Sequence, residues 1–126
     1  MPKPPSTMPR DLLEHPALFG RPTDVIWIEP TTPAGYATMR AAELQHHFVV
    51  ELTARLERAE RPKSWLEEQS GIAPGRLSKL LRGYAQLTLR DVAALEGVLG
   101  LALTSPDLPR HTISSAELKA RFAYGQ

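Results

Sequence analysis

The 126-residue sequence contains no cysteine, which excludes disulfide bonds, thiolate zinc sites and cysteine nucleophiles. Aromatic residues are scarce, at 6%, and no apolar run approaches the roughly 20 residues that a membrane-spanning helix needs. The first residues, "MPKPPSTMPRDLLEH", lack the apolar core of a signal peptide. We therefore expect a cytoplasmic protein with one domain, since domains commonly contain about 100–150 residues.

Net charge is also small, but the positive charge is concentrated in one segment. The formal net charge is +1, and 23% of the residues are charged. Residues 61–90 contain six basic and two acidic side chains, whereas the stretches before and after them are neutral or acidic. A basic patch on a nearly neutral chain indicates a polyanionic partner. A basic surface that is merely solvated is the alternative.

Proline separates the first 40 residues from the rest of the chain. Eight of the twelve prolines lie there, and proline lacks a backbone donor and clashes with the preceding helical turn. We therefore expect no long helix in residues 1–40. The apolar run Val25–Ile28, closed by Pro30, is typical of a short β-strand. Such a strand has to pair within the fold, with a second subunit or with another partner.

Residues 41–60 contain neither proline nor glycine, and their apolar residues recur every four positions. The stripe of Leu44, Phe48, Leu52 and Leu56 predicts an amphipathic helix. Pro62 ends this helix, because the residue before a proline is pushed out of helical geometry.

Two short helices are predicted next. Ser64 and Glu67 have the spacing of a capping box, and Gly71 is a typical C-terminal stop, so the first helix covers residues 64–70. The second covers residues 74–82. Pro74 is tolerated in its first turn, and Gly83 ends it.

A further helix follows Thr88, which is expected to cap it together with Asp91. Its apolar stripe consists of Leu89, Val92, Leu95 and Leu99. Capping-box spacing recurs near the end of the chain, where Ser114 and Glu117 predict a short C-terminal helix. These elements divide the chain into an N-terminal extension (1–40), a helical domain (41–103) and a C-terminal tail (104–126).

The stretch "SGIAPGRLSKLLRG" combines helix breakers with helical spacing of leucines. It is not a phosphate-binding loop of the Walker type, because only three residues separate Gly71 from Gly75, arginine follows, and a helix precedes. Two short helices joined at Gly71 instead form a helix-turn-helix. The second helix has leucines on one side and basic residues on the other, and such a helix fits the major groove of B-DNA, which is about 12 Å wide.

Residues 44–103 resemble the helix-turn-helix of the Cro/C1-type (XRE) bacterial and phage repressors. The likeness rests on a leucine in the first helix, a turn glycine with an aliphatic residue after it, an aliphatic residue six positions after the glycine, and a glycine stop. These positions are filled by Leu66, Gly71, Ile72, Leu77, Leu80 and Gly83. The apolar stripe that begins at Leu89 matches the next helix of the family.

The resemblance implies a mainly α fold. It would be a lambda-repressor-like five-helix domain with a proline-rich N-terminal extension, including the short strand, and a short C-terminal helix. It also implies a sequence-specific transcriptional regulator, typically a repressor, that binds double-stranded operator DNA in the nucleoid without a cofactor. Such proteins bind palindromic operators as homodimers, because one short helix contacts few base pairs. We expect residues 1–40 and the C-terminal helix to supply dimer or partner contacts.

Two parts of the motif depart from the family pattern. Glu67 stands where the family usually has alanine, and Ala73–Gly75 stand where it often has polar side chains that contact bases. The resemblance therefore assigns base contacts to Arg76 and the residues after it. The expected DNA-binding residues are Arg61, Lys63, Pro74, Gly75, Arg76, Ser78, Lys79, Arg82 and Tyr84.

Other functional classes have weaker support in the sequence. No local signature of catalysis is present, so we expect no enzyme. His46 and His47 are no metal pair, because neighbouring residues on a helix point about 100° apart. Two alternatives stay open: an antitoxin whose residues 1–40 wrap a toxin, and an interaction adaptor that has kept the fold and lost DNA binding.

Overall fold

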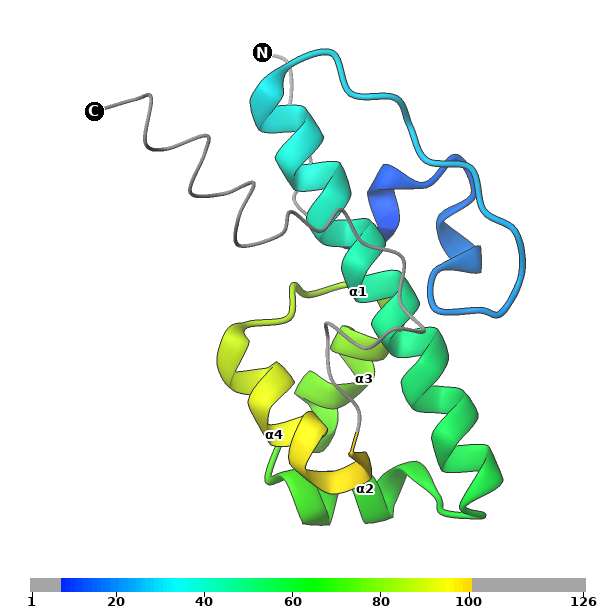
Figure 1. The fold of residues 1–126 in the computed structure, drawn as a ribbon, viewed down its shortest axis with the longest axis vertical. Coiled ribbons are helices and arrows are strands. Elements are labelled where there is room, and N and C mark those ends of the chain that lie inside the picture. The colour runs from blue at the N-terminus through cyan, green and yellow to red at the C-terminus, as the bar shows by residue number, and fades with distance from the viewer. Residues whose placement is uncertain (1–7, 101–126) are drawn as a thin grey trace, which may run out of the picture.

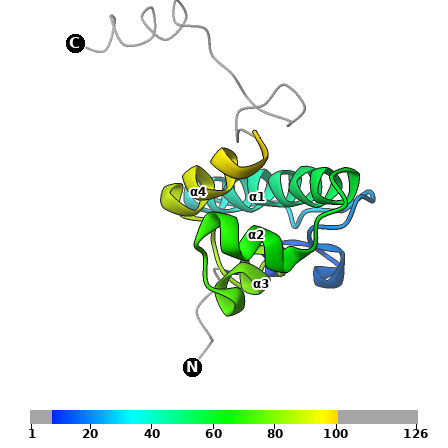
Figure 2. The same cartoon turned by 90° about the horizontal axis from the view of Figure 1, so that it is seen from below.

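The computed structural model describes residues 8–100, which form a mainly helical fold (Figure 1). Its elements are two 3-10 turns, η1 (Pro9–Leu12) and η2 (Pro16–Leu18), followed by α1 (Pro33–Arg58), α2 (Lys63–Ser70), α3 (Pro74–Arg82) and α4 (Leu89–Leu99). In Figure 2, α1 and α4 form one layer, and α2 and α3 cover one side of it. Within these residues no helix has the length and apolarity needed to cross a lipid bilayer.

The described part of the chain supplies four α-helices. The predicted C-terminal helix around Ser114 lies outside the described residues. The arrangement of five helices that is typical of a lambda-repressor-like domain therefore stays a prediction, as does the predicted C-terminal tail.

The long helix α1 begins earlier than the sequence predicted. It runs for 26 residues from Pro33, so the expectation of no long helix before residue 41 is wrong for residues 33–40. Pro33 occupies the first turn, where a backbone N–H would have no acceptor within the helix, so the missing N–H of proline costs nothing there. Thr32 caps the helix through its Oγ1, which accepts a hydrogen bond of 2.9 Å from the Gly35 N–H. The expected boundary after residue 40 consequently falls inside α1.

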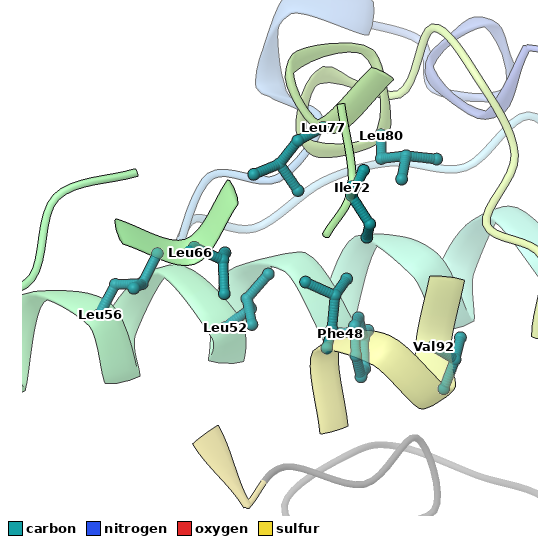
Figure 3. Close-up of a cluster of buried hydrophobic side chains, with 9 residues drawn as sticks. Phe48, Leu52, Leu56, Leu66, Ile72, Leu77, Leu80 and Val92 are labelled. Carbon is teal, nitrogen blue, oxygen red and sulfur yellow. The ribbon is translucent and has the colours of Figure 1, made fainter. Parts of the chain in front are cut away.

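The main core lies between α1 and the three shorter helices (Figure 3). Phe48 and Leu52 of α1 are 0% exposed and form its centre. The rest of the buried cluster consists of Leu56, Leu66, Ile72, Leu77, Leu80, Val92 and Leu95. Burial of each such side chain contributes about 1.5–3 kcal/mol. The predicted stripe is wrong at Leu89, which is 84% exposed.

The ends of the short helices follow the sequence signals with one exception. Gly71 and Gly83 terminate α2 and α3 with φ values of 75° and 80°, a backbone conformation that favours glycine. The predicted capping box between Thr88 and Asp91 is present at α4. The predicted box at Ser64 is absent, because α2 begins one residue earlier, at Lys63, with Pro62 as its N-cap and no side-chain cap.

The N-terminal segment packs onto the helical domain. Leu13 and Phe19 are buried against Val49 of α1, with Leu81 of α3 beside them. The approach at Gly83 is so close that a Cβ there would lie 2.7 Å from the Phe19 ring. The apolar residues expected to form a dimer or partner arm are therefore partly used within this chain.

The predicted strand at Val25–Ile28 is only one antiparallel bridge, between Leu13 and Trp27, and no strand occurs among residues 8–100. The bridge is flanked by two hydrogen bonds, from the Glu14 N–H to the Ile26 carbonyl at 2.9 Å and from the Ile28 N–H to the Leu12 carbonyl at 2.8 Å. The segment thus pairs within the fold, which was one of the three expected arrangements.

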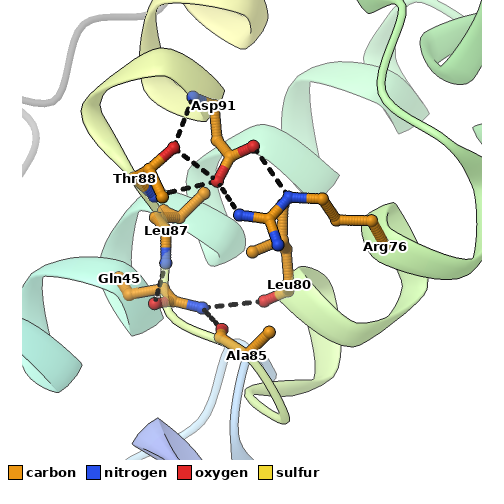
Figure 4. A network of polar contacts seen from close by, with 7 residues as sticks. All are labelled: Gln45, Arg76, Leu80, Ala85, Leu87, Thr88 and Asp91. Atoms are coloured by element: carbon orange, nitrogen blue, oxygen red, sulfur yellow. Dashed lines mark hydrogen bonds and ion pairs between the residues drawn. The ribbon is translucent and has the colours of Figure 1, made fainter.

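Gln45 of α1 is a buried polar residue, 4% exposed, that satisfies three backbone groups around the end of α3 (Figure 4). Its Nε2 donates to the carbonyls of Leu80 and Ala85 at 3.0 and 2.9 Å. Its Oε1 accepts from the Leu87 N–H at 2.9 Å. This side chain therefore holds the α3–α4 loop onto α1.

Replacement of Gln45 by leucine should lower the free energy of unfolding by about 2–4 kcal/mol, because buried backbone groups left without a partner each cost about 1–3 kcal/mol. Urea denaturation measures the effect. The matched control is Gln69→Leu at an exposed position of α2, where we expect a change of about 0.5 kcal/mol or less. Equal losses in both variants would contradict the role assigned to Gln45.

His46 anchors the N-terminal segment. It is 2% exposed, and its Nδ1 accepts a hydrogen bond of 2.9 Å from the Gly20 N–H. The rings of Phe19 and Trp27 contact the imidazole edge-on, with centroids 5.5 and 5.7 Å away. Burial, together with the neighbouring His47, lowers the pKa of His46 from 6.5 to about 4. The neutral imidazole is therefore the form that the fold requires.

Stability should fall as the pH is lowered from about 6.5 to about 4, because in this range the unfolded chain binds a proton at His46 that the folded chain excludes. The full loss amounts to about 3 kcal/mol. Urea denaturation at several pH values tests this. His46→Asn keeps an acceptor for the Gly20 N–H but cannot be protonated, so its pH dependence should be weaker than that of the wild type.

Candidate nucleic-acid interface

Helices α2 and α3 form the predicted helix-turn-helix. The turn between them is anchored by Ile72, which is 8% exposed, and the Ser70 Oγ accepts a hydrogen bond of 3.2 Å from the Ile72 N–H. Leu77 and Leu80 fix α3 to the core and are 0% exposed. One side of α3 is thereby buried, and the opposite side is left to solvent.

The outer face of α3 is formed by Gly75, Ser78, Lys79 and Arg82. Successive residues of a helix are about 100° apart, which places these four opposite Leu77 and Leu80. The side chains of Lys79 and Arg82 are exposed, and neither makes a hydrogen bond or ion pair with any residue between 8 and 100. They are therefore two cations whose charge the described part of the fold leaves uncompensated.

Arg76 does not share this face, contrary to the expectation that it would lie beside Lys79 and Arg82. Its guanidinium forms a bidentate ion pair with Asp91 of α4, with Nε–Oδ1 and Nη2–Oδ2 distances of 3.1 and 2.5 Å (Figure 4). Asp91 is 7% exposed, and its Oδ2 also accepts from the N–H and hydroxyl of Thr88. Arg76 thus joins α3 to the capped start of α4.

The ion pair shifts the pKa values of both partners toward their charged forms. Burial alone would raise the pKa of Asp91, but the hydrogen bonds from Arg76 and Thr88 outweigh it, so the pKa of Asp91 lies below its usual value. The hydrogen bond to Asp91 raises the pKa of Arg76 further. Both groups are therefore charged at neutral pH, and Arg76 is occupied within the fold.

Lys63 brings a third cation to the outer face of α3. Its Nζ donates a hydrogen bond to Ser78 Oγ, which links the first turn of α2 to the middle of α3. The same Nζ lies 3.9 Å from Glu67 Oε1. Glu67 at the position where the family usually has alanine therefore faces Lys63 and partly neutralises it.

Arg10 is a further cation near this face, and it was not among the residues predicted to bind DNA. Its N–H donates to the Gly83 carbonyl at 3.1 Å, and its Nη1 donates to the Arg82 carbonyl at 3.3 Å. Its guanidinium lies 4.1 Å from the centroid of the Tyr84 ring. No local pattern could have identified Arg10, because it lies 72 positions away from Arg82 in the sequence.

The remaining predicted residues occupy the two ends of the motif. Arg61 stacks over Trp65 of α2, with its guanidinium 5.1 Å from the ring centroid. Pro74 and Gly75 are exposed at the start of α3, which has no side-chain cap. No atom lies within 4 Å of a Cβ placed on Gly75. The first turn of α3 is therefore open, and its backbone N–H groups are accessible to an anion.

Metal binding finds no support in residues 8–100, where no three His, Cys, Asp or Glu side chains lie close enough to hold an ion. The imidazoles of His46 and His47 contact each other edge-on at 5.1 Å. The Nδ1 of His46 is already used by the Gly20 N–H. The histidine pair is thus part of the packing of the N-terminal segment.

Comparison of the chain with protein-family models, curated proteins and solved structures gave no match. The resemblance to the Cro/C1-type helix-turn-helix accordingly rests on the residues between 44 and 103 themselves.

A double-mutant cycle should separate the structural role of Arg76 from a role in binding. For Arg76→Ala and Asp91→Ala we expect a coupling of about 1 kcal/mol in the free energy of unfolding, as the pair is bidentate but partly exposed. Asp91→Ala should cost about 1 kcal/mol more than Arg76→Ala, because it also removes a cap of α4. Lys79→Ala is the control and should leave stability nearly unchanged; zero coupling would contradict the proposed link.

Proposed function

We propose that this chain is a DNA-binding transcriptional regulator whose outer face of α3 enters the major groove. The observation that carries the proposal is the uncompensated pair Lys79 and Arg82 on a rigid helix, with Lys63 beside them. The major groove is about 12 Å wide and admits one α-helix. A cationic face of this kind neutralises phosphates and donates hydrogen bonds to base edges.

The small residues at the start of α3 support a close approach to DNA. Pro74 and Gly75 present little side chain, and the uncapped first turn offers backbone N–H groups to phosphate oxygens. The side chains of Pro74 and Gly75 offer almost no contact to base edges. We therefore assign base contacts to Ser78, Lys79 and Arg82, where arginine can donate two hydrogen bonds to guanine. Arg76 acts through the α3–α4 link, and DNA shape supplies further selectivity.

The biological setting follows from this mode of binding. One nine-residue helix contacts few base pairs, so we propose that two copies bind a palindromic operator, with half-sites about 34 Å apart. The bound dimer excludes polymerase and acts as a repressor at the nucleoid in the cytoplasm. The antitoxin alternative is weaker, because residues 9–28 pack on α1 and α3 and leave less free chain to wrap a toxin.

DNA affinity should fall steeply with salt, and Lys79→Ala and Arg82→Ala should each weaken it. Every phosphate contact contributes roughly −0.9 to the slope of log K against log salt, so a variant that loses a phosphate contact should flatten the slope by about that amount. A variant that loses a base contact should instead reduce the preference for the operator duplex over an unrelated one. Fluorescence anisotropy with the duplex upstream of the gene, between about 50 and 200 mM salt, measures both effects. An unrelated duplex separates specific from non-specific binding.

The matched control is Arg58→Ala, which removes an exposed arginine from α1 that pairs with Glu51 at 3.4 Å. It should leave the affinity and the salt slope unchanged. If the wild type shows no salt-dependent binding to either duplex, the regulator is excluded and the interaction adaptor is favoured. If the three alanine variants behave alike, the outer face of α3 is not the binding surface.

A further inference from the structure

The extended segment around Trp27 has an open edge. Trp27 and Leu13 form an antiparallel pair flanked by hydrogen bonds at Ile26 and Ile28. In a pair of this type, the N–H and C=O of both residues point away from each other, because hydrogen-bonded and non-bonded pairs alternate. The N–H and C=O of Trp27 therefore face outward, and neither has a hydrogen-bond partner among residues 8–100.

The side chains beside this edge are apolar and exposed. Trp27 points inward, against His46, with ring centroids 5.7 Å apart. Ile26 and Ile28 point to the other side and are 58% and 49% exposed. An open hollow of about 440 Å³ adjoins the edge, lined by Trp27–Pro30 together with Tyr36 and Met39 of α1. In Figure 1 the ribbon between η2 and α1 runs along the outside of the molecule.

We propose that two copies of this chain associate through this edge as antiparallel strands, with Trp27 opposite the partner's Trp27. In this register the N–H and C=O of each Trp27 bond to those of the partner. The sequence Ile26-Trp27-Ile28 is symmetric about the tryptophan, so Ile26 then lies opposite the partner's Ile28. Pairs of β-branched residues at this spacing, with Cβ atoms roughly 4.5–5.5 Å apart, stabilise antiparallel sheets.

The charges and prolines of the segment are compatible with this register. Glu29 lies opposite the partner's Val25, and Asp24 opposite the partner's Pro30, so no two acidic side chains face each other directly. Pro30 has the same parity as Ile26 and Ile28, whose backbone groups point toward residues 12–14. Its missing N–H consequently removes no donor from the open edge.

The size of the contact sets its strength. One short strand from each copy buries less than the roughly 1,200 Å² of total surface that stable complexes need. We therefore expect a dimer that forms at micromolar concentrations. The interface does not depend on DNA binding, although two copies on one operator would strengthen it.

Site-directed disulfides test the register, since the natural chain has no cysteine. Ile26→Cys and Ile28→Cys are made as separate full-length proteins. Mixed and mildly oxidised, they bring unlike cysteines directly opposite each other, with Cβ atoms roughly 4.5–5.5 Å apart. A small adjustment brings these atoms to the separation of about 3.5–4.5 Å that a disulfide favours. Either protein alone places its thiols diagonally, about 7–8 Å apart. Non-reducing electrophoresis should show about tenfold more cross-linked dimer in the mixture.

Sedimentation velocity provides the second measurement. Ile26→Lys combined with Ile28→Lys should shift the protein toward monomer, whereas Leu89→Lys, at the 84% exposed position on α4, should behave as the wild type does. A wild type that stays monomeric up to about 100 µM overturns the proposal. If either cysteine protein alone cross-links as much as the mixture does, the register is wrong, and the proposal is overturned with it. DNA binding measured on the same samples reports on α3 separately.

Discussion

The burial of Leu77 and Leu80 against Phe48 and Leu52 is the contact on which the rest of the structure depends. These leucines occupy one side of a helix of only nine residues, which is too short to be stable in water alone. Burial both forms the helix and decides which side faces outward. The cationic outer face is therefore a consequence of core packing, since whatever lies opposite the leucines is necessarily exposed.

Polar contacts then fix how α3 is rotated and where it ends. The ion pair from Arg76 to Asp91 ties its first turns to α4, while Gln45 holds the loop that follows it. Arg10 caps the last carbonyls from a distant part of the chain. A helix held at both ends in this way fixes the backbone from which Lys79 and Arg82 project, which the proposed recognition of a rigid groove requires.

Several features that depend on neighbouring residues were predictable, whereas the polar contacts between distant residues were not. Gly83 and the capping residue Asp91 act locally, so their positions followed from the sequence. The absent box at Ser64 shows the limit, because α2 begins one residue earlier, at Lys63, with Pro62 as its N-cap. The second role of Asp91, as acceptor for Arg76, and the contact of Arg10 with α3 arise only once the helices are packed, and no spacing rule encodes them.

The two surfaces proposed for this chain are connected through one short segment. From the edge at Trp27 the backbone pairs with residues 12–14, and the same strip of chain continues back to Arg10 on the end of α3. This segment is held in place by Gly20, whose N–H bonds to His46, and by Phe19, whose ring packs against Gly83. A dimer built on Trp27 would therefore transmit its geometry through packed, hydrogen-bonded chain to both copies of α3. The spacing of the two outer faces, and hence of the half-sites, would be set by the N-terminal segment that sequence patterns alone mark as an appendage.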